Sequence, residues 1–270
     1  MNDTNHSLGD ISVVLPAMAP DAYLEAALRS LADQTLTPAE VLIVGPVKYH
    51  AHYASLAAQC CLPSVRLLAD KGAGLAAALI LAIGECRYEL IARMDADDIA
   101  HPERLARQHE AMMADPKLAV CGTGIRLIDQ SSRLMDIRGK GAGIQTLRSL
   151  DLLFQNPLVH PSVLMRRSLV APTGFYRKDS IAEDYDLWLR CAGRGLRMAL
   201  LGEVLLDYRV HDGQLSHAAS GLLRARQIAG AVRESLGGQH PVGVWVATAV
   251  WVTRGVFVEV KKRLSAGGAR

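Results

Sequence analysis

The stretch Tyr88–Arg104, YELIARMDADDIAHPER, reads as a buried strand, an acidic turn and the start of a helix. Its apolar run ends at Asp95, Asp97 and Asp98, and Pro102 follows. Open α/β folds bind ligands at the carboxyl ends of strands, and clustered carboxylates suit Mg²⁺ or Mn²⁺. The alternative is that Asp98 caps the helix and the other acids are solvated. Because a cap needs one acid and this turn has three, the pattern favours a metal site.

Three apolar runs that are typical of strands precede this stretch: Ile11–Leu15, Val41–Val44 and Val65–Leu68. The segments between them have the spacing of helices. Asp21 is predicted to cap a helix that continues to Leu31. Strands that alternate with helices predict a parallel sheet covered on both faces.

After the acidic turn the parallel pattern ends. We expect a helix at Pro102–Ala114 and then mixed elements: a short strand Leu118–Val120, a hairpin of Ile125–Ile128 with Leu134–Ile137, a helix near Ile144–Leu153, a strand Val163–Met165 and a helix Glu183–Cys191. The fold class is therefore α/β, with a Rossmann-like mixed sheet flanked by helices.

Composition excludes several classes of protein. A chain of 270 residues, half of them apolar, can bury a large core, and a net charge of +3 does not indicate nucleic-acid binding. The five cysteines have no metal-binding spacing, which is typical of a reduced cytoplasmic protein. The polar N-terminal residues indicate no secretory signal.

Glycines in the turn Gly72-Ala73-Gly74 match, with Ala77, a loose dinucleotide-binding fingerprint. That fingerprint normally opens the first strand–helix unit, whereas this turn follows the third strand. We therefore expect a tight helix entry, which could lie beside a phosphate. No P-loop motif occurs in the chain.

A second acidic pair, Glu183 and Asp184, lies in the first turn of the predicted helix Glu183–Cys191. Acids in a first turn interact favourably with the helix dipole, which by itself explains the pair. A general base held near the metal site is the other interpretation, and the residues alone do not choose between the two.

Four ordered motifs together resemble the family 2 glycosyltransferases with the GT-A fold, nearest to the exopolysaccharide subgroup typified by AmsE. They are MDADDIAHPERLARQ, NPLVHPSVLMRR, EDYDLWLR and LLDYRVHDGQLS, and the resemblance covers about Ile11 to Ser216. It implies a catalytic domain at residues 1–217 and a basic, apolar helical extension at 218–270.

The resemblance also implies roles for the acids. Asp95 and Asp97, with Asp98 adjacent, would hold a divalent metal against the diphosphate of a nucleotide sugar. Asp184, next to Glu183, would be the base that deprotonates the acceptor hydroxyl in an inverting displacement.

Further positions follow from the same motifs. His211 is a candidate third metal or phosphate contact, although a lone histidine is more often structural. His160, Trp188 and Arg190 are candidates for the acceptor side, with a core role as the alternative for Trp188. The candidates for donor binding lie at strand ends and in the glycine turn, and they are Pro16, Ala17, Gly45, Lys71, Gly74 and Arg93.

The chain departs from the family where relatives hold the nucleotide base. A Tyr-Asn pair after the first strand is replaced by Ala17 and Met18, and an Asp before Gly45 is absent. A typical Asn in the helix after Gly74 is also lost. These changes remove hydrogen bonds worth about 1 kcal/mol each and predict altered base selectivity.

The segment after Leu222 is rich in arginine and lysine around the apolar run Val242–Val258, which Arg254 interrupts. The run is too short for a confident transmembrane helix. An interfacial helix at an anionic membrane and a helix packed on the domain or in a dimer are both open.

The expected function is transfer of a sugar from a nucleoside diphosphate sugar, UDP-linked in the first instance, to a glycan or lipid-linked acceptor in bacterial surface polysaccharide synthesis. It would take place in the cytoplasm or at the inner face of the plasma membrane, with peripheral membrane contact and no nucleic acid. The alternatives are a catalytically impaired binding or scaffold protein and a sugar nucleotidyltransferase, which would need a basic triphosphate loop that the first turn lacks.

Overall fold

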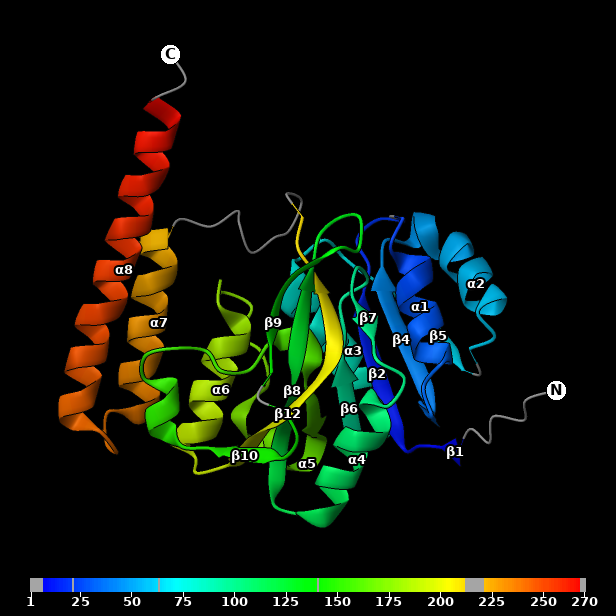
Figure 1. Ribbon diagram of the computed structural model, residues 1–270, viewed down its shortest axis with the longest axis horizontal. Coiled ribbons are helices and arrows are strands. Elements are labelled where there is room, and N and C mark those ends of the chain that lie inside the picture. The colour runs from blue at the N-terminus through cyan, green and yellow to red at the C-terminus, as the bar shows by residue number, and fades with distance from the viewer. Residues whose placement is uncertain (1–6, 21, 63, 140, 212–220, 268–270) are drawn as a thin grey trace.

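The computed structural model describes residues 7–267 except 21, 63, 140 and 212–220 (Figure 1). The strands are β1 (Ser7–Leu8), β2 (Ile11–Pro16), β3 (Leu36–Thr37), β4 (Glu40–Gly45), β5 (Val65–Ala69), β6 (Leu90–Arg93), β7 (Ile99–Ala100), β8 (Leu118–Ile128), β9 (Leu134–Arg138), β10 (Ile144–Leu147), β11 (Leu164–Arg166) and β12 (Arg197–Arg209). The helices are α1 (Leu24–Ala32), α2 (His50–Gln59), α3 (Leu75–Glu85), α4 (Arg104–Ala114), α5 (Arg167–Val170), α6 (Glu183–Gly193), α7 (Gly221–Leu236) and α8 (Pro241–Gly267).

A ten-stranded sheet within the described residues organises the molecule, with the path β10-β12-β8-β11-β6-β2-β4-β5. Strands β6, β2, β4 and β5 are all parallel. Strand β11 runs antiparallel between β6 and β8. The predicted parallel first half and mixed second half are confirmed, and they belong to one sheet.

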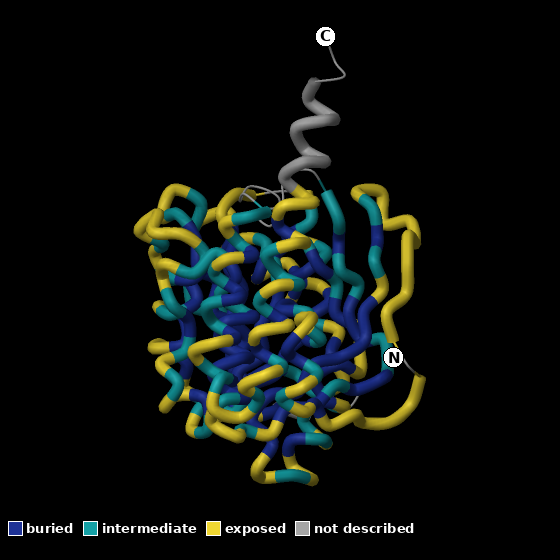
Figure 2. Tube along the Cα trace, turned by 90° about the vertical axis from the view of Figure 1, so that its left-hand side faces the viewer, coloured by how far each residue is buried: buried dark blue, intermediate teal, exposed yellow. Residues whose placement is uncertain are grey.

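Both faces of the sheet are apolar because alternate residues of the central strands point to opposite sides. In β2, Val13 and Leu15 pack with α1 and α4, while Val14 packs with α3 and α6 on the other face. Figure 2 shows that the buried residues lie in the centre of the molecule, with exposed residues around them. Because β6, β2, β4 and β5 are parallel, their carboxyl ends meet at one edge of the sheet.

The region 118–128 forms one strand, β8, so the prediction of two separate strands at Leu118–Val120 and Ile125–Ile128 was wrong. Gly122 and Gly124 interrupt the apolar pattern because neighbours approach them closely, and not because the chain turns. An added Cβ would lie 2.6 Å from the Leu158 side chain at Gly122 and 2.9 Å from the Glu203 carbonyl at Gly124.

The prediction of a helix near Ile144–Leu153 was also wrong. Residues 144–147 form β10, which pairs antiparallel with β12, and Ser149–Leu152 is a short 3₁₀ helix. Gly141 and Gly143 have positive φ angles and end the preceding segment, and β-branched Ile144 and Thr146 suit an edge strand. Pairing with β12 therefore overrides the weak helical periodicity.

The long strand β12 is the main element that periodicity missed. It pairs in parallel with β8 and antiparallel with β7. Strand β7 is the strand that directly follows the acidic turn. Pairing with β7 places Arg209, the last residue of β12, in hydrogen-bonding contact with Asp97 and Asp98. These acids lie 112 and 111 residues earlier in the sequence. The predicted cap Asp21 lies outside the described residues, and the backbone residue that precedes α1 is Tyr23.

The C-terminal helices pack against the rest of the chain. Ile228, Val232 and Leu236 of α7 and Val244 of α8 are buried in the same core as Trp188 of α6. The predicted boundary at residue 217 lies outside the described residues. Because the extension shares this core, its deletion would expose apolar surface and is a poor test of any separate role.

Candidate active site

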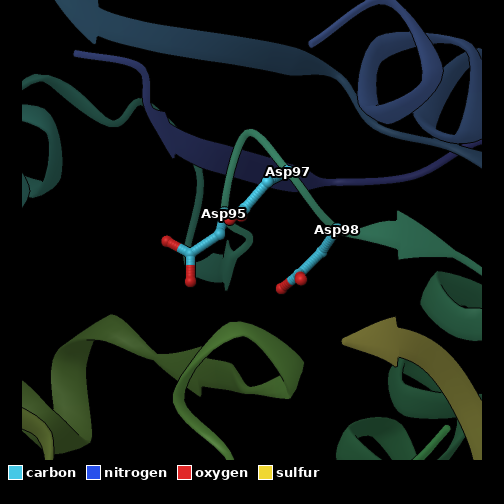
Figure 3. Close-up of side chains that lie close together, drawn as sticks. All are labelled: Asp95, Asp97 and Asp98. Carbon is cyan, nitrogen blue, oxygen red and sulfur yellow. The ribbon is translucent and has the colours of Figure 1, made fainter. Parts of the chain in front are cut away.

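The acidic turn connects β6 to β7 at the carboxyl edge of the sheet, where its three carboxylates gather (Figure 3). Asp95 forms a two-pronged ion pair with Arg93, whose two terminal nitrogens each lie 2.6 Å from one of its oxygens. Burial raises the pKa of Asp95, Arg93 opposes that effect, and the charges of Asp97 and Asp184 add to it. Arg93, predicted to bind the donor, thus supports the first acid of the turn.

Asp97 and Asp98 are held by residues from the end of β12. The Asp97 carboxylate lies 2.8 Å from Nε2 of His211, which brings together two residues that the motifs predicted to act jointly. The backbone N–H of Arg209 donates to Asp98 at 2.9 Å, and its Nε donates to the carbonyl of Asp97 at 2.9 Å. The Arg209 guanidinium lies over the Tyr23 ring, 4.3 Å from its centre.

Asp98 is fully buried, and its second oxygen, Oδ2, accepts no hydrogen bond from the described residues. Burial, together with the charges of Asp95 and Asp97, raises its pKa well above the ordinary range. An unsatisfied buried carboxylate oxygen is costly unless a ligand or cation completes it.

A divalent cation fits this arrangement. One oxygen from each of Asp95, Asp97 and Asp98 lies within 4.8 Å of the others, and hard carboxylate oxygens are the ligands that Mg²⁺ and Mn²⁺ prefer. The buried unpartnered oxygen of Asp98 is the local observation that favours a cation here over a helix cap.

Glu183 and Asp184 begin α6, with Asp184 in electrostatic reach of Asp95. Asn156 donates a hydrogen bond of 2.8 Å from its amide nitrogen to one oxygen of Asp184. Burial raises the pKa of Asp184, and burial followed by the Asp184 charge raises that of Glu183. A carboxylate whose pKa is raised is a better proton acceptor, which suits a general base.

His160 is buried next to Glu183, so it is not exposed as expected for a residue on the acceptor side. Its Nε2 is 2.8 Å from the Tyr176 hydroxyl, and its Nδ1 is 3.8 Å from a Glu183 oxygen. Burial, reinforced by the charge of Arg93, lowers its pKa well below the ordinary value, so the ring is neutral. The hydrogen bond of His160 is therefore made to Tyr176, and Glu183 is a close neighbour of the ring.

Trp188 and Arg190 do not fit the predicted acceptor side. Trp188 is 0% exposed and lies in the core, so neither face of its ring is open to a sugar. Arg190 pairs with Asp186 at 2.8 Å and donates to the carbonyls of Thr173 and Phe175. Because α6 is covered on this side, both residues are structural.

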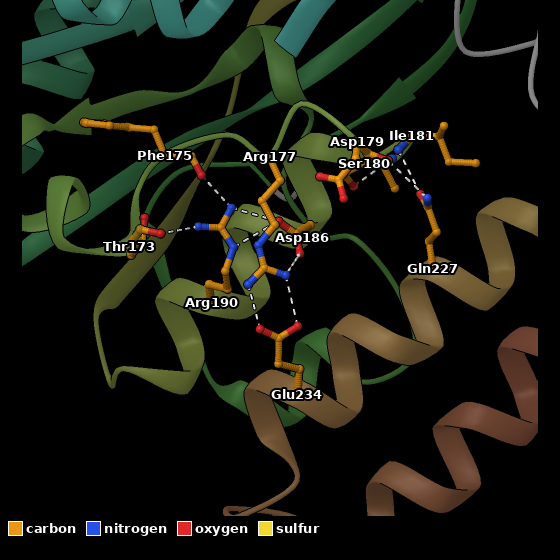
Figure 4. Close-up of polar contacts among 11 residues, drawn as sticks. Thr173, Phe175, Arg177, Asp179, Ser180, Ile181, Asp186, Arg190, Gln227 and Glu234 are labelled. Atoms are coloured by element: carbon orange, nitrogen blue, oxygen red, sulfur yellow. Dashed lines mark hydrogen bonds and ion pairs between the residues drawn. The ribbon is translucent and has the colours of Figure 1, made fainter. Parts of the chain in front are cut away.

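Arg190 belongs to an ion network that joins α6 to α7 (Figure 4). Arg177 lies between the two helices, 3.4 Å from Asp186 and 2.6 Å from Glu234 of α7. The network fixes the helix that carries Asp184 against the C-terminal extension.

The predicted donor residues lie along the same edge as the acidic turn. Pro16 ends β2, Gly45 ends β4, and Lys71 and Gly74 follow β5 before α3. Gly74 has a φ of +89° at the entry to α3, which explains the glycine there without a ligand.

Ala17 and Gly45 contact each other, which limits what they offer to a nucleotide. An added Cβ at Gly45 would lie 2.3 Å from the Ala17 carbonyl oxygen, and the Tyr53 hydroxyl donates to that oxygen at 2.9 Å. His50 Nε2 is 3.0 Å from the Gly45 carbonyl. Side chains of α2 therefore occupy the backbone groups at this strand end.

Motif reasoning missed the residues that hold the predicted ligands in place. Asn156 is the first residue of one quoted motif, and Arg209 lies two residues before His211 in another, but the motifs gave neither residue a role. Neither role can be found from spacing, because each partner is distant in sequence.

Comparison with known proteins supports the same family. The model of glycosyl transferase family 2 matches residues 12–170. The chain is 30% identical over 218 residues to the O-antigen biosynthesis glycosyltransferase WbnJ of Escherichia coli, covering 77% of this chain and 83% of that protein. It is 32% identical over 190 residues to the amylovoran biosynthesis glycosyltransferase AmsE of Erwinia amylovora, covering 69% and 70%.

Solved structures share the fold at low sequence identity. TarS of S. aureus in complex with UDP-GlcNAc superposes with a TM-score of 0.66 at 16% identity, covering 83% of this chain and 67% of that one. The mannosyltransferase PcManGT of Pyrobaculum calidifontis, in complex with GDP-Man and Mn²⁺, has a TM-score of 0.60 at 15% identity, covering 99% and 81%. Because the family model matches residues 12–170, more than half of this chain, the chain belongs to glycosyltransferase family 2.

Proposed function

We propose that this protein is an inverting, metal-dependent glycosyltransferase that moves a sugar from a nucleoside diphosphate sugar to a hydroxyl group of a glycan or lipid-linked acceptor. The observation that carries the proposal is the electrostatic proximity of two acidic sites: burial raises the pKa of Asp95 in the acidic turn after β6, and the charge of Asp184 at the start of α6 adds to that effect. Family membership favours this reaction over nucleotidyl transfer.

The chemistry divides between the two sites. Asp184 accepts the proton of the acceptor hydroxyl while that oxygen bonds to the anomeric carbon and the bond to the diphosphate breaks on the opposite face. A divalent cation bound by Asp95, Asp97 and Asp98 would neutralise the charge that builds on the departing diphosphate. Asn156 holds the base by its hydrogen bond, and Arg93 holds Asp95.

A UDP-linked sugar is the proposed donor, supported by the UDP-GlcNAc complex of TarS. The GDP-Man complex of PcManGT indicates that the fold alone does not select the base. Because Ala17 and Gly45 offer only backbone groups, already engaged with Tyr53 and His50, we infer weaker base discrimination than in relatives that place an acid there.

A thermal-shift screen with UDP, GDP and dTDP sugars tests the donor. In the presence of Mn²⁺ we expect UDP sugars to raise the melting temperature, because binding to the folded state stabilises it by about 2.7 kcal/mol at 100 times the dissociation constant. EDTA should remove the shift. If no nucleotide sugar shifts the melting temperature, the catalytically impaired scaffold becomes the better description.

The proposed acceptor is a lipid-linked glycan. Bacterial polysaccharide synthesis as its setting is supported by the similarity to WbnJ, an O-antigen biosynthesis enzyme, and to AmsE, an amylovoran biosynthesis enzyme. Residues Pro241–Val258 are long and apolar enough, by length and composition, to cross a membrane. One side of α8 nevertheless packs on the protein, since Val244 and Ala247 are buried and Trp251 donates to the Leu153 carbonyl at 2.9 Å. We infer that α8 lies at the membrane surface, on the cytoplasmic side.

The outward face of α8 supports that inference. Trp245 is 67% exposed and Phe257 69% exposed, and other exposed apolar residues share this side of the helix: Val242, Val246 and Val256. The sequence continues with Lys261, Lys262 and Arg263, which would attract anionic lipid.

Flotation with anionic vesicles checks the membrane contact in the full chain. The double variant Trp245→Glu, Phe257→Glu should lose most vesicle binding, since charge on an apolar face opposes insertion. Val47→Glu is the matched control, because Val47 is an exposed apolar residue outside α8. Equal flotation of the double variant and the wild type would rule out this face as the contact.

A further inference from the structure

Two side chains of α7 hold the backbone directly before the acidic pair of α6. Gln227 accepts a hydrogen bond from the Ile181 N–H at 2.9 Å and donates to the Asp179 carbonyl at 3.2 Å. Arg224 donates from Nη2 to the Ile181 carbonyl at 3.1 Å. Both polar backbone groups of Ile181 are therefore satisfied by the C-terminal extension, and Figure 4 shows Gln227 reaching this segment.

Arg224 has hydrogen-bond donors besides the one that it uses for Ile181. Its Nε is buried with no hydrogen-bond partner within the described residues, and it forms no ion pair with any of them. Burial raises the pKa of Glu183 and of Asp184, and the charge of Arg224 lowers both, after the larger opposing effect of Arg93. A planar guanidinium offers five donors and stays charged, so this residue brings a fixed positive charge to the site.

Several other groups act on Asp184. Arg93 contributes a positive charge from β6, but both of its terminal nitrogens are committed to Asp95. Asn156 contributes a neutral hydrogen bond. The remaining facing groups are acidic or phenolic, and they are Glu183, Asp95, Tyr176 and Tyr185. Among the described residues, no carboxylate forms an ion pair with Arg224.

We propose that α7 completes the active site, with Arg224 as a positioning residue whose charge stabilises the Asp184 carboxylate and whose hydrogen bond, together with Gln227, fixes the backbone that presents it. The inference rests on the proposed role of Asp184 as the base. It gives the C-terminal extension a part in catalysis besides its packing.

The test compares full-length variants that separate charge from hydrogen bonding. Arg224→Gln keeps a donor and removes the charge, Arg224→Lys keeps the charge, and Gln227→Ala keeps the charge but releases Ile181. Arg226→Ala is the matched control, because Arg226 is an exposed arginine on the same helix.

A carboxyl ¹³C NMR titration of Asp184 needs no substrate. Arg224→Gln should move the Asp184 titration to higher pH, because a stabilising positive charge is lost, and Arg224→Lys should largely restore it. Gln227→Ala and Arg226→Ala should leave the titration near that of the wild type. An unmoved titration in Arg224→Gln overturns the proposal, as does an equal displacement in Arg226→Ala.

The second measurement uses the nucleotide sugar that the thermal-shift screen identifies. Arg224→Gln should lower kcat about tenfold at neutral pH, with the acidic limb of the pH profile moved upward and the KM for the donor little changed. Gln227→Ala should lower kcat without moving that limb. If Arg224→Gln moves the NMR titration but no nucleotide sugar binds, the proposed function fails, and only the electrostatic effect of Arg224 on Asp184 stands.

Discussion

Replacement of Asp184 by asparagine is expected to lower sugar transfer by about 10²–10⁴-fold, the usual contribution of a general base. Asparagine has nearly the same shape but cannot take the acceptor proton at neutral pH. Donor binding should persist, because the acidic turn and the strand ends are untouched. Initial rates of transfer, together with the donor-induced thermal shift, measure the two effects separately.

The control for this variant is Asp179→Asn, which removes an exposed carboxylate from the segment just before α6. It should leave transfer within about twofold of the wild type, as expected for a surface substitution. Transfer that survives in Asp184→Asn would remove Asp184 from the base role and direct attention to Glu183.

The pH profile of the wild type follows from the same residue. Burial raises the pKa of Asp184 above the ordinary value for an aspartate, and only the deprotonated form accepts a proton. Activity should therefore fall on acidification at a higher pH than an exposed aspartate would give.

Replacement of Asp97 by asparagine is expected to remove metal-dependent donor binding and to lower transfer by at least about 100-fold. The variant loses one of three clustered ligand carboxylates while its backbone contacts to Arg209 remain. Calorimetric titration with Mn²⁺ should show weaker binding, and the donor should no longer shift the melting temperature. The exposed acid Asp136 of β9 provides the control variant Asp136→Asn.

The neighbouring substitution Asp95→Asn should behave differently. It strips buried Arg93 of its partner, and an uncompensated buried charge costs about 3 kcal/mol in the free energy of unfolding. Chemical denaturation should thus reveal lower stability in Asp95→Asn but not in Asp97→Asn. Equal stability of the two variants would contradict the supporting role of Arg93.

Local sequence was a good guide wherever a residue's role depends on its own neighbours. The acidic turn, the first strands and the hairpin at 125–138 follow from runs, breaks and turn residues a few positions apart, and the structure confirms them. The motif resemblance then predicted the family, which the comparisons confirm.

Failures occurred where distant partners decide the structure. Gly122 and Gly124 looked like a break in a strand because sequence does not show that Leu158 and Glu203 press against them. Trp188 was left open between core and sugar platform, and only the packing of α6 against the rest of the fold buries it.

The sequence by itself determined which residues we propose to carry the chemistry: Asp95, Asp97 and Asp98 at a strand end, and Glu183 with Asp184 at a helix start. Only the tertiary structure decided what surrounds them, because pairing of β8 with β12 brings Arg209 and His211 to the turn, and packing of α7 on α6 brings Arg224 to the backbone of Ile181, just before Asp184. The physical reason is that side-chain chemistry is a local property. The field and hydrogen bonds around a carboxylate come from whichever segments the fold packs against it.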